Sequence, residues 1–113
     1  MNDAETVNAI PGDFRPLRLR MRPGGQAVDL RGPNLVLGRH SECDLRMPLA
    51  DVSRRHCRFV FSAGVWDIID LGSLNGVYVN GDRVQRITLH AGDHIRLGGL
   101  ELEVEVPNAA AAA

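Results

Sequence analysis

The segment LELEVEV, residues 100–106, alternates strictly between aliphatic and acidic residues. Successive side chains of a β-strand point to opposite faces of a sheet, so this pattern predicts a strand with one buried and one solvated face. The glutamates Glu101, Glu103 and Glu105 are therefore expected on the water-facing side, where they form no carboxylate site.

Short runs with the same two-residue alternation recur throughout the chain, and no long window keeps a helical period. We predict strands at residues 17–21, 27–30, 35–37, 44–47, 57–62, 65–69, 77–79, 83–84, 94–97 and 100–106. Turn sequences such as Pro23-Gly24-Gly25, Ala63-Gly64 and Asn80-Gly81 separate them. Many short strands joined by tight turns predict an all-β fold, either a sandwich or a barrel.

The length of 113 residues suits one domain, and the apolar share of 44% and charged share of 24% are typical of folded globular chains. We expect a folded domain over residues 17–106, a flexible N-terminal tail over 1–16, and a flexible tail or linker stub over 107–113. The first residues lack the pattern of a signal peptide, so a cytoplasmic location is expected. In that compartment Cys43 and Cys57 are expected to be reduced thiols.

The formal net charge is only −1, with 13 basic and 14 acidic residues. A domain that coats nucleic acid relies on summed positive charge, so neither nucleic acid nor a membrane is an expected partner. All the basic residues are arginine, which has two explanations: codon bias in a GC-rich genome, or selection for guanidinium groups that bind oxyanions in a bidentate way. Any recognition of anions must therefore be local.

Three connections, residues 38–44, 48–56 and 71–76, are longer than hairpin turns, and long loops on a rigid β scaffold often carry binding residues. Arg39 follows a predicted strand, so its guanidinium is expected to leave the core. The run Ser53-Arg54-Arg55-His56 adds a hydroxyl, two guanidiniums and an imidazole. Asn75 offers an amide able to donate and accept at once, as a peptide backbone requires. The combination indicates binding of an oxyanion carried by a peptide.

Four blocks in order along the chain resemble the motifs of the forkhead-associated (FHA) domain: Gly38-Arg39, Ser53-Arg54-Arg55-His56, Gly72-Ser73-Leu74-Asn75-Gly76 and Asn80-Gly81. The resemblance covers roughly residues 17–106. It implies a β-sandwich of about eleven strands in two sheets, with the binding loops gathered at one end. The strands predicted from alternation agree with this fold.

The resemblance implies a phosphopeptide-binding module that recognises phosphothreonine on a partner protein in Ser/Thr kinase signalling, with no reaction and no cofactor. The chain is expected to be a monomer. Leu74 stands where several family members place a polar residue that touches the ligand, which leaves the peptide selectivity open. The implied phosphopeptide-binding residues are Arg39, Ser53, Arg54, Leu74 and Asn75, and the implied structural residues are Gly38, His56, Gly76, Asn80 and Gly81.

Other chemistries fit the sequence less well. Ser53 and His56 lack the glycine elbow and the acidic partner of a hydrolase. A phosphate-cradling nucleotide loop would need a lysine, which the chain does not contain. His90 and His94 have the spacing of a metal pair, but we expect a hairpin turn at Gly92 and find no third ligand at suitable spacing, so no metal site is predicted.

Two alternative functions remain open. The first is a scaffold that binds partners through a sheet face, independently of phosphorylation. The second is intramolecular regulation, in which phosphorylated Thr6, close to Asp3 and Glu5 in the acidic tail, occupies the protein's own pocket.

Overall fold

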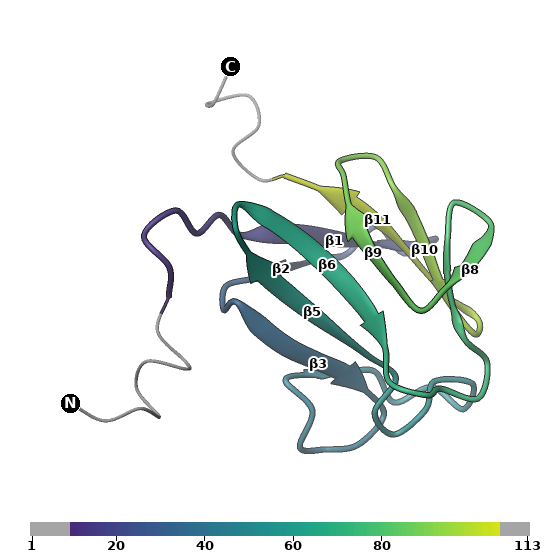
Figure 1. Cartoon of the computed structure of the whole chain (residues 1–113). Helices are drawn as coiled ribbons and strands as arrows, with labels where there is room; N and C mark the ends of the chain where they lie inside the picture. Colours follow the sequence, from purple (N-terminus) through teal and green to yellow (C-terminus); the bar gives the residue numbers. More distant parts are fainter. Residues whose placement is uncertain (1–9, 107–113) are drawn as a thin grey trace.

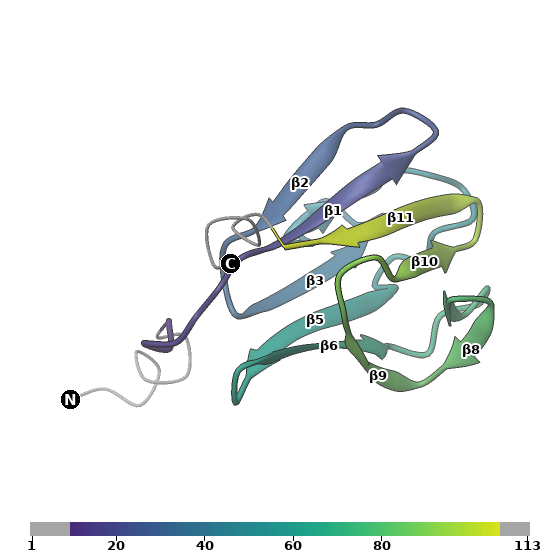
Figure 2. The same cartoon turned by 90° about the horizontal axis from the view of Figure 1, so that it is seen from above.

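The computed structural model describes residues 10–106, which form two stacked β-sheets (Figures 1 and 2). One sheet has the order β2-β1-β11-β10-β7-β8, with β1 (Leu17–Arg22), β2 (Ala27–Leu30), β7 (Val77–Val79), β8 (Asp82–Val84), β10 (His94–Leu97) and β11 (Leu100–Glu105). The other has the order β4-β3-β5-β6-β9, with β3 (Asn34–Gly38), β4 (Leu45–Arg46), β5 (Cys57–Ser62), β6 (Val65–Asp70) and β9 (Arg86–Leu89). The predicted all-β sandwich is confirmed. Over this range no helix is long and apolar enough to cross a membrane.

Every predicted strand is present, with its ends within one residue of the prediction, but β9 was not predicted. Only Leu89 of β9 is buried, so the strand shows no alternation and is formed by its pairing with β6. The hairpin turn expected at Gly92 is also wrong. β9 and β10 belong to different sheets, so residues 90–93 carry the chain from one layer to the other.

The two sheets bury their aliphatic faces against each other. In β11, Leu100, Leu102 and Val104 are buried, as the alternation predicts. Cys57 on β5 is also fully buried, and burial raises the pKa of its thiol far above the ordinary value. The thiol therefore stays protonated within the core.

The packed part of the chain begins before Leu17, which differs from the expected tail of residues 1–16. The ring of Phe14 lies edge-on to Phe61 and Trp66, with centroids 5.3 and 5.8 Å away. The indole Nε1 of Trp66 donates a hydrogen bond to the carbonyl oxygen of Arg15 at 2.8 Å. An aromatic cluster thus fixes this segment. The remainder of the predicted tails, residues 1–9 and 107–113, lies outside the described residues.

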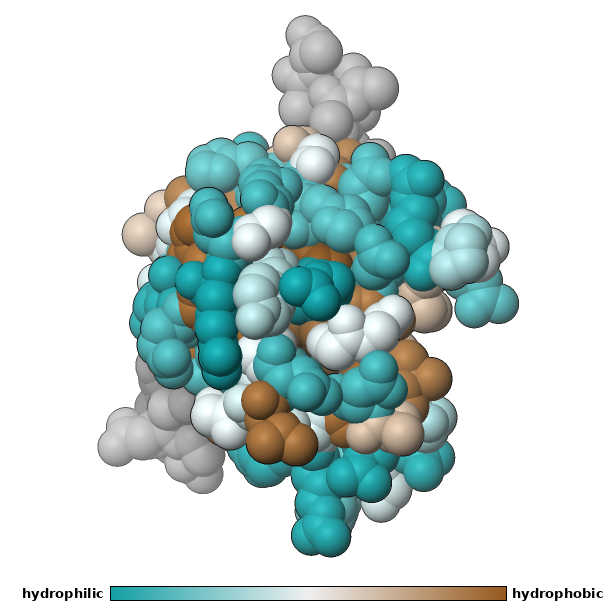
Figure 3. All heavy atoms as spheres, turned by 90° about the vertical axis from the view of Figure 1, so that its right-hand side faces the viewer, coloured by the Kyte–Doolittle hydropathy of each residue, from teal (hydrophilic) through white to brown (hydrophobic). Residues whose placement is uncertain are grey.

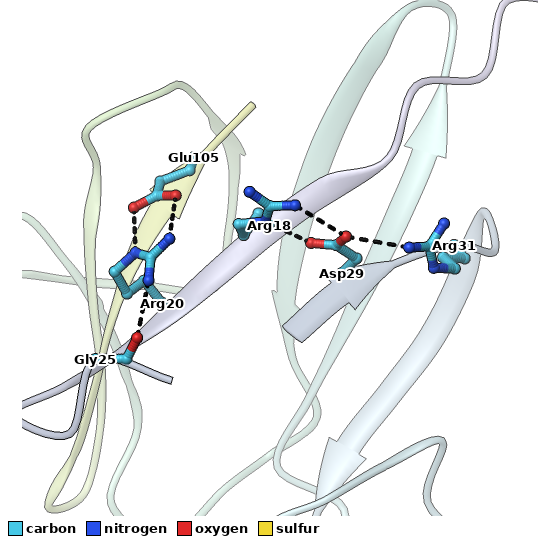
Figure 4. A network of polar contacts seen from close by, with 6 residues as sticks. All are labelled: Arg18, Arg20, Gly25, Asp29, Arg31 and Glu105. Atoms are coloured by element: carbon cyan, nitrogen blue, oxygen red, sulfur yellow. Dashed lines mark hydrogen bonds and ion pairs between the residues drawn. The ribbon is translucent and has the colours of Figure 1, made fainter. Parts of the chain in front are cut away.

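The outer face of the six-stranded sheet carries ion pairs between neighbouring strands (Figure 4). Arg20 on β1 holds Glu105 on β11 through two hydrogen bonds of 2.6 and 3.1 Å. Arg18 holds Asp29 on β2 in the same way, at 2.7 and 3.2 Å. These hydrogen bonds lower the pKa values of Glu105 and Asp29. Glu103 and Glu105 of β11 therefore lie on the solvated face and neutralise Arg22 and Arg20 of β1.

The Arg20–Glu105 pair predicts a specific dependence of stability on pH. Because the folded-state pKa of Glu105 is lowered, the pair stabilises the fold above the unfolded-state pKa of about 4.3, and this contribution is lost as the pH falls through the folded-state value. Arg20→Gln should therefore lower the free energy of unfolding at pH 7, and the difference from wild type should shrink at about pH 2. Urea denaturation of both proteins between pH 7 and about pH 2 measures this difference. Arg58→Gln, which removes a contact with the neutral Asn34, is the control. If the difference in free energy of unfolding between Arg20→Gln and wild type stays constant with pH, the Arg20–Glu105 ion pair is not its cause.

Candidate functional site

The three long connections meet at one end of the sandwich, the lower end in Figure 1. The backbone N–H of Arg39 donates to the carbonyl oxygen of Ser53 at 2.9 Å, which joins the first two connections. The N–H of Leu74 donates to the Ser53 side-chain oxygen, Oγ, at 3.1 Å, which adds the third. Residues far apart in the sequence therefore meet around Ser53.

Gly38 allows the first two connections to approach so closely. A Cβ atom on Gly38 would lie 2.1 Å from the carbonyl oxygen of Arg54 and 2.9 Å from the Cα of Arg55. Both neighbours are backbone atoms, so they cannot give way as a flexible side chain would. The glycine before Arg39 is thus a steric requirement of the site.

Arg39 has one side of its guanidinium fixed and the other side exposed. Its Nε donates to the carbonyl oxygen of Val52 at 3.1 Å. Beside it, Nε of Arg46 faces the carbonyl oxygen of Arg39 at 3.4 Å. An open hollow of about 460 Å³ lies here, lined by Arg39, His40, Ser41, Arg46 and Arg54. Among residues 10–106, no carboxylate lies within ion-pair distance of Arg39, Arg46 or Arg54. The hollow therefore has an unneutralised positive charge and suits an anion.

His56 braces the site from beneath. Its side chain is fully buried, and its Nδ1 accepts a hydrogen bond from the N–H of Ser53 at 3.0 Å. Its Nε2 lies 2.8 Å from the carbonyl oxygen of Gly76 and donates to it, because Nδ1 is already an acceptor. The imidazole thus links the second connection to the third. Both ring nitrogens are engaged, so His56 is not available as an acid or a base.

The third connection presents Asn75 and Leu74 at the surface. The amide nitrogen of Asn75, Nδ2, donates to the carbonyl oxygen of Asp51 at 2.8 Å. The buried Ser73 shapes the turn, since its Oγ accepts from the N–H of Gly76 at 3.0 Å. Leu74 is 86% exposed, an unusual position for a leucine. The amide of Asn75 is held in place while one of its protons and its oxygen remain for a ligand.

The structure brings most of the predicted site residues together. The five residues predicted to bind the phosphopeptide lie at this end, and Gly38, His56 and Gly76 lie directly behind them. Asn80 and Gly81 lie apart, in the turn between β7 and β8. Their φ values of 52° and 89° are those of a two-residue hairpin turn. The side-chain oxygen of Asn80 also accepts from the N–H of His94 on β10 at 2.9 Å.

Several residues of the site were not predicted from the sequence. The carbonyl oxygens of Asp51 and Val52 fix Asn75 and Arg39, and backbone groups leave no trace in the residue types. Arg46 lies in a predicted strand, which gave no reason to place it in the hollow. For Ser73 an available pattern was the spacing Asp70-x-x-Ser73, since the carboxylate of Asp70 accepts from the N–H of Ser73 at 2.9 Å.

Gly38→Ala should disrupt both stability and the site. The new methyl group must displace the backbone at Arg54, so we expect a loss of about 2 to 4 kcal/mol in the free energy of unfolding, measured by urea denaturation. Gly24→Ala is the matched control, because a Cβ there has no neighbour within 4 Å. It should be neutral or slightly stabilising. If the two variants have equal free energies of unfolding, the close approach of the backbone at Gly38 does not limit stability.

The comparison with known proteins agrees with this geometry. The model of the FHA domain family matches residues 35–98, which is more than half of the chain. The chain therefore belongs to the FHA domain family, which confirms the resemblance noted in the sequence. A solved structure from a structural and functional analysis of phosphothreonine-dependent FHA domain interactions has 36% identity and a TM-score of 0.75. It covers 80% of this chain and 96% of that one.

Two curated relatives are bacterial regulators. The oxoglutarate dehydrogenase inhibitor of Corynebacterium efficiens is 40% identical over 100 residues, which are 88% of this chain and 70% of that protein. The glycogen accumulation regulator GarA of Mycolicibacterium smegmatis is 34% identical over 97 residues, 85% of this chain and 61% of that protein. The chain thus spans about six to seven tenths of the length of these two relatives.

Proposed function

We propose that the chain binds a partner protein through a phosphorylated threonine, in signalling by Ser/Thr kinases. One observation carries the proposal: Arg39, Ser53 and Asn75 come from three connections that hydrogen bonds hold together, and Arg39 lines a hollow of unneutralised guanidiniums. Phosphate needs such a set, because it carries about −1.5 to −2 charges at pH 7 and accepts several hydrogen bonds.

Each group has a distinct role in this proposal. The exposed guanidinium nitrogens of Arg39 bind two phosphate oxygens in a bidentate way. Ser53 Oγ already accepts from Leu74, so its own proton is free to donate to the phosphate. Arg54 supplies further charge from the wall of the hollow. The amide of Asn75 holds the backbone of the peptide, and Leu74 contacts its flank.

The proposed activity is binding without catalysis. Nothing next to Ser53 activates it as a nucleophile, since the nearby imidazole uses both of its nitrogens structurally. The names of the two relatives, a regulator and an inhibitor, support action through another protein. We place this action in the cytoplasm, where the free Cys43 and Cys57 would remain reduced. We propose a monomeric domain, with neither nucleic acid nor a membrane as partner.

The two alternatives make different claims. A scaffold independent of phosphorylation would bind its partner equally well after Arg39 is removed. Intramolecular regulation depends on Thr6, which lies outside the described residues. Identical affinity for a phosphopeptide before and after phosphorylation of Thr6 would exclude that form of regulation.

Arg39→Ala should weaken the binding of phosphothreonine peptides by about 2 to 4 kcal/mol, or roughly 30-fold to 1000-fold, because it removes both charge and fork geometry. Titration calorimetry with a phosphothreonine peptide library measures the effect, and matched phosphoserine and unphosphorylated peptides establish specificity. Arg31→Ala is the control, since Arg31 is exposed and follows β2 at the opposite end of the sandwich. A loss below about threefold for Arg39→Ala would refute its assignment.

Binding should also depend on the ionisation of the phosphate. Its second pKa is about 6, so the share of peptide that carries the dianion falls roughly tenfold between pH 7 and pH 5. The apparent affinity for the peptide should fall with it. His40 lines the hollow, so the titration is repeated with His40→Gln to remove any contribution from this side chain. The fall should persist in the variant, because it comes from the phosphate itself. An affinity that does not change with pH in this variant would argue against recognition of the dianion.

A further inference from the structure

A row of outward-facing side chains crosses three strands next to the proposed site. In the strand register, Arg83 on β8 lies opposite Tyr78 on β7, and Tyr78 lies opposite Arg96 on β10. The neighbours of Tyr78 along its strand, Val77 and Val79, are buried, so Tyr78 points outward. Arg83, Tyr78 and Arg96, here called the arginine–tyrosine row, thus share the outer face of the sheet.

The row adjoins the third connection of the site. A Cβ atom on Gly76 would lie 2.8 Å from Nε and 3.2 Å from Nη2 of Arg83, so this guanidinium rests against the backbone next to Asn75. At the other end of the row, Cζ of Arg96 lies 4.4 Å from the centroid of the Tyr78 ring. The aromatic face holds that guanidinium and leaves its edge for hydrogen bonds. The two cations are therefore positioned before any partner arrives.

The charges of this row are not neutralised within the described chain. None of the ion pairs in residues 10–106 includes Arg83 or Arg96. Glu101, which is opposite Arg96 in the register, instead contacts Nε2 of His94 at 3.0 Å. The arginines of β1 in the same sheet are all paired, as Figure 4 shows for Arg18 and Arg20. Figure 3 shows that the face on the side of β8 and β10 is mainly hydrophilic, which suits a polar partner.

We propose that the arginine–tyrosine row binds acidic residues of the partner on one side of its phosphothreonine. This inference rests on the proposed phosphothreonine site, because Asn75 would hold the peptide directly beside Arg83. Strands lie about 4.8 Å apart, so the row spans about 10 Å, which an extended peptide covers in about three residues. The acidic residues are therefore expected about two to five positions from the phosphothreonine.

The test uses three phosphothreonine peptides: one with neutral flanks, one with a block of aspartates before the phosphothreonine, and one with the same block after it. One acidic peptide should bind wild type about threefold to tenfold more tightly than the neutral peptide. The double variant Arg83→Gln/Arg96→Gln should lose this gain and still bind the neutral peptide within about twofold of wild type. Arg31→Gln, with an exposed side chain at the opposite end, should keep the gain.

Two results would overturn the inference while the phosphothreonine site stands: no gain from either acidic block, or a gain that the double variant keeps. Loss of the neutral peptide by the double variant would also overturn it, because the two arginines would then belong to the phosphothreonine site itself. If wild type binds none of the three peptides, the proposed function fails and the inference fails with it.

Discussion

The arrangement of the site depends on one buried imidazole. His56 holds the N–H of Ser53 on one ring nitrogen and the carbonyl oxygen of Gly76 on the other, with no exposed surface of its own. Without it, a backbone donor and a backbone acceptor would remain unsatisfied in the interior, at a cost of about 1 to 3 kcal/mol each. A histidine is suited to this place because a neutral ring accepts at one nitrogen and donates at the other. The serine and the asparagine turn are thereby kept in one fixed relation.

The distribution of arginine explains how a nearly neutral chain can recognise an anion. Of the 13 arginines, five form ion pairs within residues 10–106, mostly across β1, β2 and β11. Those around the hollow form none. Opposite charges in close ion pairs largely cancel, and salt screens the remainder over about 10 Å, so the paired arginines contribute little field around the hollow. The arginines around the hollow thus keep their positive charge while the net charge of the chain stays near zero.

The sequence predicted what depends on alternation and on side-chain chemistry. The strands β5, β6 and β11 have clear buried and solvated faces, and their limits followed from that pattern. β9 has one buried residue and owes its existence to β6, so no local pattern reveals it. Within the site, Arg39 and Ser53 were recognisable from their chemistry and motif. The carbonyl oxygens of Asp51 and Val52 were not, because any residue carries the same backbone group.

The turn at Asn80-Gly81 connects the fold to the binding surface. Both residues have positive φ values, as a two-residue turn requires, and this turn sets the pairing of Tyr78 with Arg83. A slip of one residue would move Arg83 to the opposite face of the sheet, away from Gly76. The hydrogen bond from the N–H of His94 to Asn80 also fixes the turn against β10, the strand that carries Arg96. A motif assigned only a structural role therefore determines whether the arginine–tyrosine row exists beside the proposed phosphothreonine site.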